Sequence, residues 1–209
     1  MNSIAQLLVK HEIVKINFQN PFTWVSGIKS PIYCDCRELM SLPEARNIII
    51  NQLCQQITEQ KMCSDVIAGT ATAGIPWASF VAQKLDLPLL YVRSKPKDHG
   101  AGKMVEGRCE KGKNILVVED ALSTAGSSIV SANALREELS ATVTNILAIF
   151  SWDTPQAKEN ATKDNVNLHY LTKFSEIAEA LLEMEKITSE EKASLERFHE
   201  DPKNWYQSS

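Results

Sequence analysis

Residues 114–128 read NILVVEDALSTAGSS, and this stretch decides the fold class of the chain. The apolar run from Ile115 to Val118 predicts a buried strand, because both faces of such a strand must meet apolar neighbours. Glu119 and Asp120 then fall where the strand leaves the sheet. Ligands of open α/β sheets bind at that edge. The stretch therefore predicts an α/β fold with a ligand site at the carboxyl end of this strand.

The residue types around this strand end indicate which ligand it takes. Two adjacent carboxylates, Glu119 and Asp120, offer acceptors to the two hydroxyls of a vicinal diol. The residues after them are mostly small, so backbone N–H groups can surround a phosphate at the start of the next helix. These residues are Ala121, Leu122, Ser123, Thr124, Ala125, Gly126 and Ser127. The segment predicts a ribose-phosphate site.

Other interpretations of the same segment are weaker. In an ordinary strand-to-helix turn, the two acids are solvated and Ser127 or Ser128 is only an N-cap. A cap needs one hydroxyl, whereas this turn supplies four together with two carboxylates. A Walker phosphate loop is excluded because no Gly-Lys-Ser/Thr is present here. A dinucleotide fingerprint is excluded because Gly-x-Gly-x-x-Gly is missing.

The rest of the chain alternates between strand-like and helix-like periodicity. This pattern is typical of βαβ units and predicts a largely parallel central sheet flanked by helices. Strands are expected at 65–68, 87–92, 115–118, 144–150 and 169–171. Helices are expected at 3–11, 43–60, 75–85, 128–139, 175–185 and 189–199. Residues 70–74 form an expected turn between the strand at 65–68 and the next helix. The turn after the strand at 115–118 likewise joins a strand to a helix.

Length, composition and charge limit the class of protein. The chain has 209 residues, 44% of them hydrophobic, which predicts one domain with one substantial core. The formal net charge of −4 argues against a nucleic-acid partner, because such partners are bound by clustered Lys and Arg. No membrane-length apolar run and no signal core is visible. We expect a cytoplasmic protein without a membrane partner.

The five cysteines are odd in number and scattered along the chain. This distribution fits reduced thiols better than a disulfide framework. Cys34 and Cys36 could suggest a metal pair, but zinc takes four ligands at recognisable spacing and no second pair follows. We therefore expect no metal site built by the protein.

Residues 93–107, RSKPKDHGAGKMVEG, join two expected strands with few apolar residues to hold them. We expect a mobile loop. Two glycines, Gly100 and Gly102, give its backbone freedom. In an acidic protein, such a concentration of positive charge predicts a lid that closes on an anion. The alternative is a solvated loop without a role. The positive side chains are Arg93, Lys95, Lys97, His99 and Lys103.

Residues 22–37, FTWVSGIKSPIYCDCR, are rich in aromatic and turn residues, and could line the site of a flat heteroaromatic ring. Together with GTATAGIP at 69–76, YVRSKPKDHG at 91–100 and VVEDALSTAGS at 117–127, this segment resembles the orotate phosphoribosyltransferase family, with the motifs in the family's order. The resemblance covers residues 19–152, and DPKNW at 201–205 is also similar. It implies the type I phosphoribosyltransferase fold, in which about residues 1–40 form an N-terminal hood and about residues 173–209 form C-terminal helices of a single domain.

The resemblance also implies a reaction and its partners. Ribose 5-phosphate would pass from 5-phospho-α-D-ribose 1-diphosphate (PRPP) to orotate, giving orotidine 5′-monophosphate and diphosphate in pyrimidine biosynthesis. Mg²⁺ would arrive with the PRPP diphosphate, since this ion keeps several waters and binds substrate phosphates with few protein ligands. The family is typically a homodimer with shared active sites, in which the lid reaches the neighbouring subunit.

By the same resemblance, the catalytic residues are Lys97, His99 and Asp120. Arg93, Lys97 and His99 would hold the diphosphate, and Glu119 and Asp120 the ribose hydroxyls. The residues from Ser123 to Ser127 would bind the 5′-phosphate, and Ala121 and Leu122 would belong to the same PRPP site. Residues 70–74 would offer amides to the diphosphate. For orotate, the candidates are Ser123, Lys29 and Tyr33, although Tyr33 fits a core contact equally well.

Three positions depart from residues that some family members carry. A lysine is replaced by Val25, a Tyr-Lys pair by Thr72 and Ala73, and an arginine soon after Trp152 has no counterpart at Asp153 or Thr154. Each change removes positive charge, so the donors to orotate stay open. Two further functions stay open as well: a PRPP-binding regulatory protein of the same fold, and a phosphoribosyltransferase for another base.

Overall fold

The computed structural model describes residues 3–24, 27–62, 64–96 and 102–208. The chain divides into two compact units. Unit 1 contains residues 1–39 and 172–209, and unit 2 contains residues 40–171. The prediction that all 209 residues form a single domain stays a prediction. No described helix is long and apolar enough to cross a membrane.

Unit 2 is built on a six-stranded sheet with the order β10-β9-β8-β5-β6-β7. Its strands are β5 (Val66–Thr70), β6 (Leu89–Val92), β7 (Val105–Glu106), β8 (Ile115–Leu122), β9 (Asn145–Ser151) and β10 (Asn167–Lys173). β5 pairs in parallel with β6 and β8, and β8 pairs in parallel with β9. β7 is antiparallel to β6. The predicted, largely parallel α/β sheet is confirmed.

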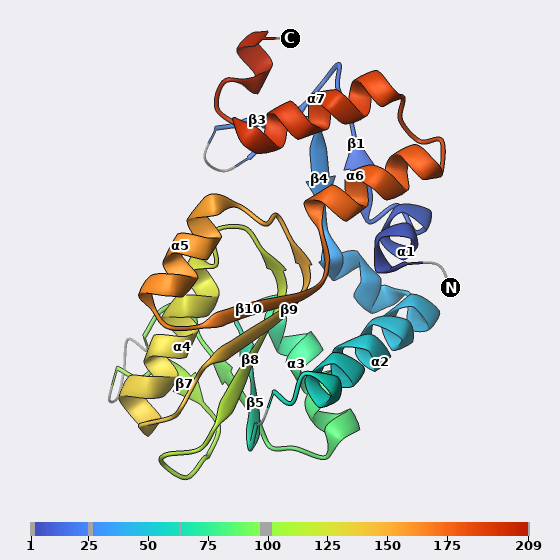
Figure 1. The fold of residues 1–209 in the computed structure, drawn as a ribbon. Coiled ribbons are helices and arrows are strands. Elements are labelled where there is room, and N and C mark those ends of the chain that lie inside the picture. The colour runs from blue at the N-terminus through green and yellow to red at the C-terminus, as the bar shows by residue number, and fades with distance from the viewer. Residues whose placement is uncertain (1–2, 25–26, 63, 97–101, 209) are drawn as a thin grey trace. The chain divides into compact units, whose positions relative to one another are not determined.

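Helices cover both faces of this sheet (Figure 1). α2 (Pro43–Glu59) and α3 (Gly74–Leu85) pack on one face, and α4 (Gly126–Leu139) and α5 (Pro155–Lys163) on the other. Alternate residues of a strand point to opposite faces. Accordingly Val66, Ala68 and Val117 pack under α4 and α5 in one apolar cluster, while Gly69 lies directly under α3. Both faces of the central strands are buried, as a parallel sheet requires.

The strand β8 is longer than expected. We predicted a strand that ends at Val118, but pairing with β9 continues through Glu119↔Ala148 to Leu122↔Ser151. The two acids therefore lie inside the last part of the strand rather than beyond it. Polar residues are tolerated there because β9, itself almost fully buried, supplies backbone hydrogen bonds on that side.

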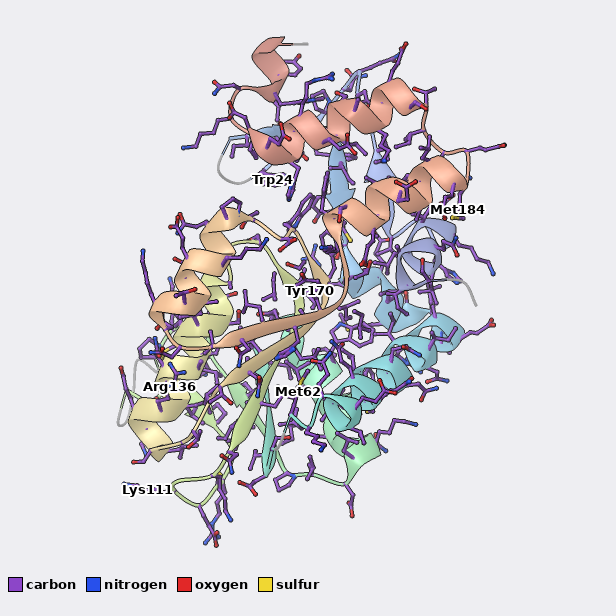
Figure 2. All side chains as sticks on the ribbon, in the orientation of Figure 1. Trp24, Met62, Lys111, Arg136, Tyr170 and Met184 are labelled. Atoms are coloured by element: carbon purple, nitrogen blue, oxygen red, sulfur yellow. The ribbon has the colours of Figure 1, made fainter. Side chains whose placement is uncertain are left out.

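Unit 1 combines the N-terminal segment with the C-terminal helices. It contains α1 (Ile4–Lys10), β1 (Val14–Ile16), β2 (Phe22–Thr23), β3 (Lys29–Ser30), β4 (Ile32–Cys34), the start of a 3-10 helix (Cys36–Ser41), α6 (Phe174–Glu183), α7 (Ser189–Glu200) and a last 3-10 turn (Trp205–Ser208). Trp24, labelled in Figure 2, meets Phe198 edge to face at 5.7 Å. Phe198 in turn packs against Trp205 at 5.8 Å. These aromatic contacts join the two ends of the chain.

Candidate active site

Three segments meet at the carboxyl edge of the sheet. β5 lies between β6 and β8, with Thr70 opposite Val92 and Gly69 opposite Val118. Since these strands are parallel, the turns that follow them emerge side by side. The Glu-Asp segment, residues 70–74 and Arg93 are therefore neighbours at this edge.

The turn between β8 and α4 does not have an ordinary serine cap. α4 begins at Gly126, and the N-cap position is occupied by Ala125, whose backbone is left-handed with φ 58° and ψ 11°. No side chain caps this end. Ser128 instead donates its hydroxyl to the Ala125 carbonyl at 3.2 Å. The alternative of a plain serine-capped turn is therefore wrong.

Side chains and backbone outside the turn bind its carbonyl groups. Leu122 O accepts from Trp152 N at 2.8 Å, and Ser123 O accepts from the Thr154 hydroxyl at 2.8 Å. Thr124 O accepts from Asn160 Nδ2 at 2.9 Å. Among the described residues, the backbone N–H groups of residues 123–128 meet no acceptor. A row of such N–H groups at a helix N-terminus is an anion-binding arrangement.

The two carboxylates differ in their surroundings. Glu119 is only 5% exposed, whereas Asp120 is half-buried. Glu119 Oε1 accepts from Asp120 N at 3.1 Å, and Oε2 accepts from the Ser127 hydroxyl at 3.5 Å. Burial, followed by the adjacent charge of Asp120, raises the pKa of Glu119 to about 9. Glu119 is therefore protonated at neutral pH in the ligand-free protein.

The turn between β5 and α3 is tightly packed. A Cβ on Gly74 would lie 2.5 Å from Val118 O and 3.1 Å from Glu119 Oε1. A Cβ on Gly69 would lie 2.7 Å from Ile75 Cα. The Thr70 hydroxyl is buried and approaches the Glu119 carboxyl, which opposes part of the rise in the pKa of Glu119. This turn therefore brings α3 into direct backbone contact with β8 and places a hydroxyl beside Glu119.

Arg93 is held at the end of β6. Its N–H donates to Met104 O at 3.0 Å, Nε donates to Lys95 O at 3.2 Å, and Nη1 lies 3.6 Å from Glu106 Oε1. A cavity of about 390 Å³ adjoins it, lined by Ala71, Arg93, Ser94, Lys95 and Pro96. The guanidinium thus borders a hollow next to the β5–α3 turn.

The predicted loop at 93–107 is anchored at its second end, contrary to our expectation. Val105 and Glu106 form β7 against β6. Glu138 of α4 accepts from Met104 N at 2.7 Å and Val105 N at 3.3 Å. Met104 and Val105 also pack against the apolar cluster of unit 2. Lys97 and His99, the predicted catalytic residues of the lid, lie outside the described residues.

The candidates for the base site lie in unit 1. Lys29 of β3 donates to the Thr23 hydroxyl at 2.7 Å. The Tyr33 ring of β4 lies 5.7 Å from that of Phe22, and its hydroxyl accepts from Arg37 at 3.1 Å. Both side chains thus have partners within unit 1. Ser123, the third candidate for orotate, is exposed in the β8–α4 turn of unit 2.

In the described part of the chain, no three His, Cys, Asp or Glu side chains cluster as a metal site would require. Cys34 and Cys36 form no disulfide, and their sulfurs lie 3.9 Å apart. The chemistry of the site fits a metal that is held mainly by its substrate. Asp120 offers one accessible carboxylate, whereas Glu119 is buried and protonated.

Two side chains of this site, Thr154 and Asn160, were not predicted from the sequence. There, Thr154 only marks the place of an arginine that some family members carry. A signal for the helix that carries Asn160 was present, because Thr154 followed by Pro155 is a typical N-cap and first-turn pair. That signal predicts α5, but no sequence pattern predicts that Asn160 reaches Thr124.

The fold and the β8–α4 turn define a phosphoribosyltransferase, and the phosphoribosyl transferase domain family matches residues 42–183. The chain is 43% identical to the orotate phosphoribosyltransferase of Coxiella burnetii and 46% identical to that of Streptococcus pneumoniae serotype 4, in each case over 97% of this chain and 96% of the relative. The crystal structure of orotate phosphoribosyltransferase from Aeropyrum pernix, 28% identical, superposes with a TM-score of 0.72 over 85% of this chain and 98% of that one. The chain belongs to the orotate phosphoribosyltransferase family.

This membership confirms the resemblance seen in the sequence. Both relatives bear the name of the orotate enzyme, and neither is named as a regulatory protein or as a phosphoribosyltransferase for another base.

Proposed function

We propose that this chain transfers ribose 5-phosphate from PRPP to orotate, forming orotidine 5′-monophosphate and diphosphate in pyrimidine biosynthesis, and that the β8–α4 turn holds the ribose 5-phosphate. The observation that supports this most is the row of N–H groups from residue 123 to residue 128, which lies beside the carboxylates of Glu119 and Asp120. One turn therefore offers donors to a phosphate and acceptors to ribose hydroxyls.

The 5′-phosphate belongs at the residues from Ser123 to Ser127. Their amide hydrogens point away from the carbonyls that Thr154 and Asn160 hold. The exposed hydroxyls of Thr124 and Ser127 add donors. Ala125 and Gly126 allow close approach, because neither has a side chain that projects far from the backbone.

Asp120 is the catalytic carboxylate in this proposal. In the reaction, the bond from the ribose C1 to the diphosphate oxygen breaks and its electron pair leaves with the diphosphate. C1 bonds to a ring nitrogen of orotate, and the proton of that nitrogen is released to water. Positive charge develops on the ribose as the diphosphate leaves. A carboxylate that accepts from the ribose hydroxyls orients the sugar and opposes that charge. Asp120 is partly exposed and can reach a ligand.

Glu119 is the second carboxyl group of the same site, and it accepts from Asp120 N and from the Ser127 hydroxyl. It is buried and protonated in the ligand-free protein, with a pKa of about 9. Magnesium-loaded PRPP carries a net negative charge, and a nearby negative charge disfavours the ionised carboxyl. Glu119 is then expected to stay protonated when this substrate binds.

Mg²⁺ is the expected cofactor, and it arrives with the PRPP diphosphate. When bound, it neutralises charge on the diphosphate. Asp120, with its accessible carboxylate, is the residue of the β8–α4 turn that suits contact with the waters of this ion. The protein needs no metal cage of its own for this role.

The lid contributes cations to the diphosphate. Arg93, Lys97 and His99 are the residues proposed for it, with Lys97 and His99 stabilising the leaving group. We further propose a homodimer in which the lid serves the neighbouring active site. Ser123, Lys29 and Tyr33 are the proposed contacts of orotate. A cytoplasmic location and the absence of nucleic-acid and membrane partners complete the proposal.

The test of the reaction is the loss of orotate absorbance in the ultraviolet with purified protein, PRPP and Mg²⁺. Adenine, hypoxanthine, guanine and uracil replace orotate in parallel samples. Orotate consumption that needs Mg²⁺ and is abolished by Lys97→Ala is the expected result. Turnover of a different base would overturn the substrate, and PRPP binding without any turnover would overturn the enzyme assignment.

Shared active sites are tested by mixing two inactive variants. Lys97→Ala and Asp120→Ala subunits are unfolded together and refolded, so that mixed dimers form. If the lid serves the neighbouring site, part of the activity returns, because one site in each mixed dimer has both residues. Mixed dimers that stay inactive, although each parent folds and pairs, would show that each site is built by a single subunit.

A further inference from the structure

We propose that Thr154 and Asn160 are positioning residues for the PRPP site: their side chains from α5 and its N-cap fix the directions of the backbone N–H groups in the β8–α4 turn before any ligand binds. This inference deepens the proposed function and rests on it. It concerns two side chains that bind carbonyl groups of the turn and that have no proposed contact with the substrate.

The peptide bond is planar, so the atoms of one peptide unit rotate together. In a trans peptide, the carbonyl of one residue and the N–H of the next point in opposite directions and rotate together. Thr154 binds Ser123 O at 2.8 Å, so it also fixes the N–H of Thr124. Asn160 binds Thr124 O at 2.9 Å and so fixes the N–H of Ala125. Both N–H groups must therefore point away from α5.

The neighbouring peptides are fixed in the same manner. Trp152 N binds Leu122 O at 2.8 Å, which orients the N–H of Ser123. Ala125 O accepts from Ile129 N at 3.0 Å in the first turn of α4. Four successive carbonyls thus have donors. The amide hydrogens on the other side of the turn meet no acceptor among the residues that the structure describes.

A third side chain orients Asn160 itself. Gln156 Nε2 donates to Asn160 Oδ1 at 3.0 Å, which leaves the amide nitrogen of Asn160 directed at the turn. Thr154 is similarly constrained, since it accepts from Ala157 N at 3.2 Å as the N-cap of α5 while its hydroxyl donates to Ser123 O. The two donors are therefore held by α5 rather than by the turn.

Without these donors, a peptide of the turn can rotate and direct a carbonyl oxygen at the phosphate. An anion site needs N–H groups that are already in place, since reorienting them on binding costs free energy. The loss affects the bound substrate and the transition state equally, because the phosphate stays bound throughout. A raised KM for PRPP with an unchanged kcat is the signature of such a loss.

Asn160 provides the clean test. It is half-buried on α5, and Asn160→Ala removes the donor without harm to helix propensity. Asn160→Asp keeps the size but replaces the donor by an acceptor. The matched control is Thr162→Ala on the same helix, because Thr162 is exposed and bonds only to Lys158 O of its own helix.

We expect KM for PRPP and the Kd of ribose 5-phosphate, measured by calorimetry, to rise about fivefold in Asn160→Ala, the effect of one hydrogen bond. Asn160→Asp should lose more, and Thr162→Ala should match the parent protein. The kcat and the KM for orotate should stay unchanged. Thr154→Ser keeps both hydroxyl bonds and should retain affinity, whereas Thr154→Val should lose it.

Unchanged KM and Kd in both Asn160 variants would overturn the positioning role, and so would a fall in kcat without a change in KM. The Kd of ribose 5-phosphate distinguishes a failure of this inference from a failure of the proposed function. A parent protein that consumes no orotate but binds ribose 5-phosphate more tightly than Asn160→Ala would contradict the reaction and support the positioning role.

Discussion

The turn after β5 and the turn after β8 emerge at the same edge of one sheet, yet they are held by different means. In the β5–α3 turn, glycines bring the backbones of α3, β5 and β8 together, and no space remains for a Cβ at Gly69 or Gly74. In the β8–α4 turn, side chains of another helix bind the carbonyls at Ser123 and Thr124. The first turn is fixed by packing and the second by hydrogen bonds.

The difference shows where changes should affect the fold and where they should affect binding. Packing at the β5–α3 turn is part of the contact between α3 and the sheet, so substitutions there act on the free energy of unfolding. The β8–α4 turn lies at the surface, with exposed side chains at Ser123 and Thr124. Substitutions there should leave stability intact and change affinity or rate.

The largest expected effect lies in the β8–α4 turn and concerns catalysis alone. Asp120→Ala should lower kcat/KM for orotate by about 100-fold, or about 3 kcal/mol, because an electrostatic group at the reacting sugar is lost. Steady-state kinetics with saturating Mg²⁺ measures it, and thermal unfolding should show an unchanged Tm. Nearly full activity in this variant would remove Asp120 from the catalytic residues.

The next effect lies in the β5–α3 turn and concerns stability. Gly74→Ala should lower the free energy of unfolding by about 2 kcal/mol, since a Cβ forced against a backbone carbonyl requires movement of α3 or β8. The added carbon would lie 2.5 Å from Val118 O. Urea denaturation gives the value. A variant as stable as the parent would mean that α3 is not tightly packed on β8.

The third prediction concerns the pH dependence of stability at Glu119. The Glu119 carboxyl accepts from Ser127 of one turn and lies near Gly74 of the other. The pKa of Glu119 is about 9 in the folded protein and near the ordinary Glu value when unfolded, so the folded state binds the extra proton. The contribution of Glu119 to the free energy of unfolding is largest at low pH and falls as pH rises toward 9. Glu119→Gln should therefore gain stability over the parent by about 1.4 kcal/mol per pH unit at most, between pH 5 and about 9.

Urea midpoints at pH 6 and pH 8 measure this gain. The control is Glu137→Gln, because Glu137 is exposed on α4 in the same unit. Its difference from the parent should be the same at both pH values. If Glu119→Gln gives an equally constant difference, then Glu119 is already ionised in the folded protein and its burial does not govern its charge.

The smallest effect is expected for Gly126→Ala, the counterpart of the Gly74 variant in the other turn. The nearest atom to an added Cβ is Thr124 Oγ1 at 3.5 Å, which is an ordinary contact. Gly126 lies in α4, where alanine is favoured over glycine, so stability should change by less than about 1 kcal/mol and in the favourable direction. Urea denaturation beside Gly74→Ala tests it. A comparable loss in both variants would abolish the distinction between the turns.

Much of the fold was predictable because its signals are local. The apolar run at 115–118, the helical periodicity at 43–60 and the segment at 144–150 each lie in the element observed, within a few residues of its bounds. The candidate ribose-phosphate turn was predictable for the same reason, since its acids and small residues are contiguous. β7 and α5 escaped prediction. β7 is too short for a periodic pattern, and α5 has little apolar periodicity to mark it.

The sequence by itself determined the family, the sheet and the turn with its two acids, because each depends on residues that are neighbours in the chain. Only the tertiary structure decided that Glu119 is buried and protonated while Asp120 faces outward. It also decided that Thr154 and Asn160 donate to the carbonyls of Ser123 and Thr124, more than thirty residues before them. Burial and hydrogen-bond partners depend on what packs nearby in space, and no local pattern of residues records that.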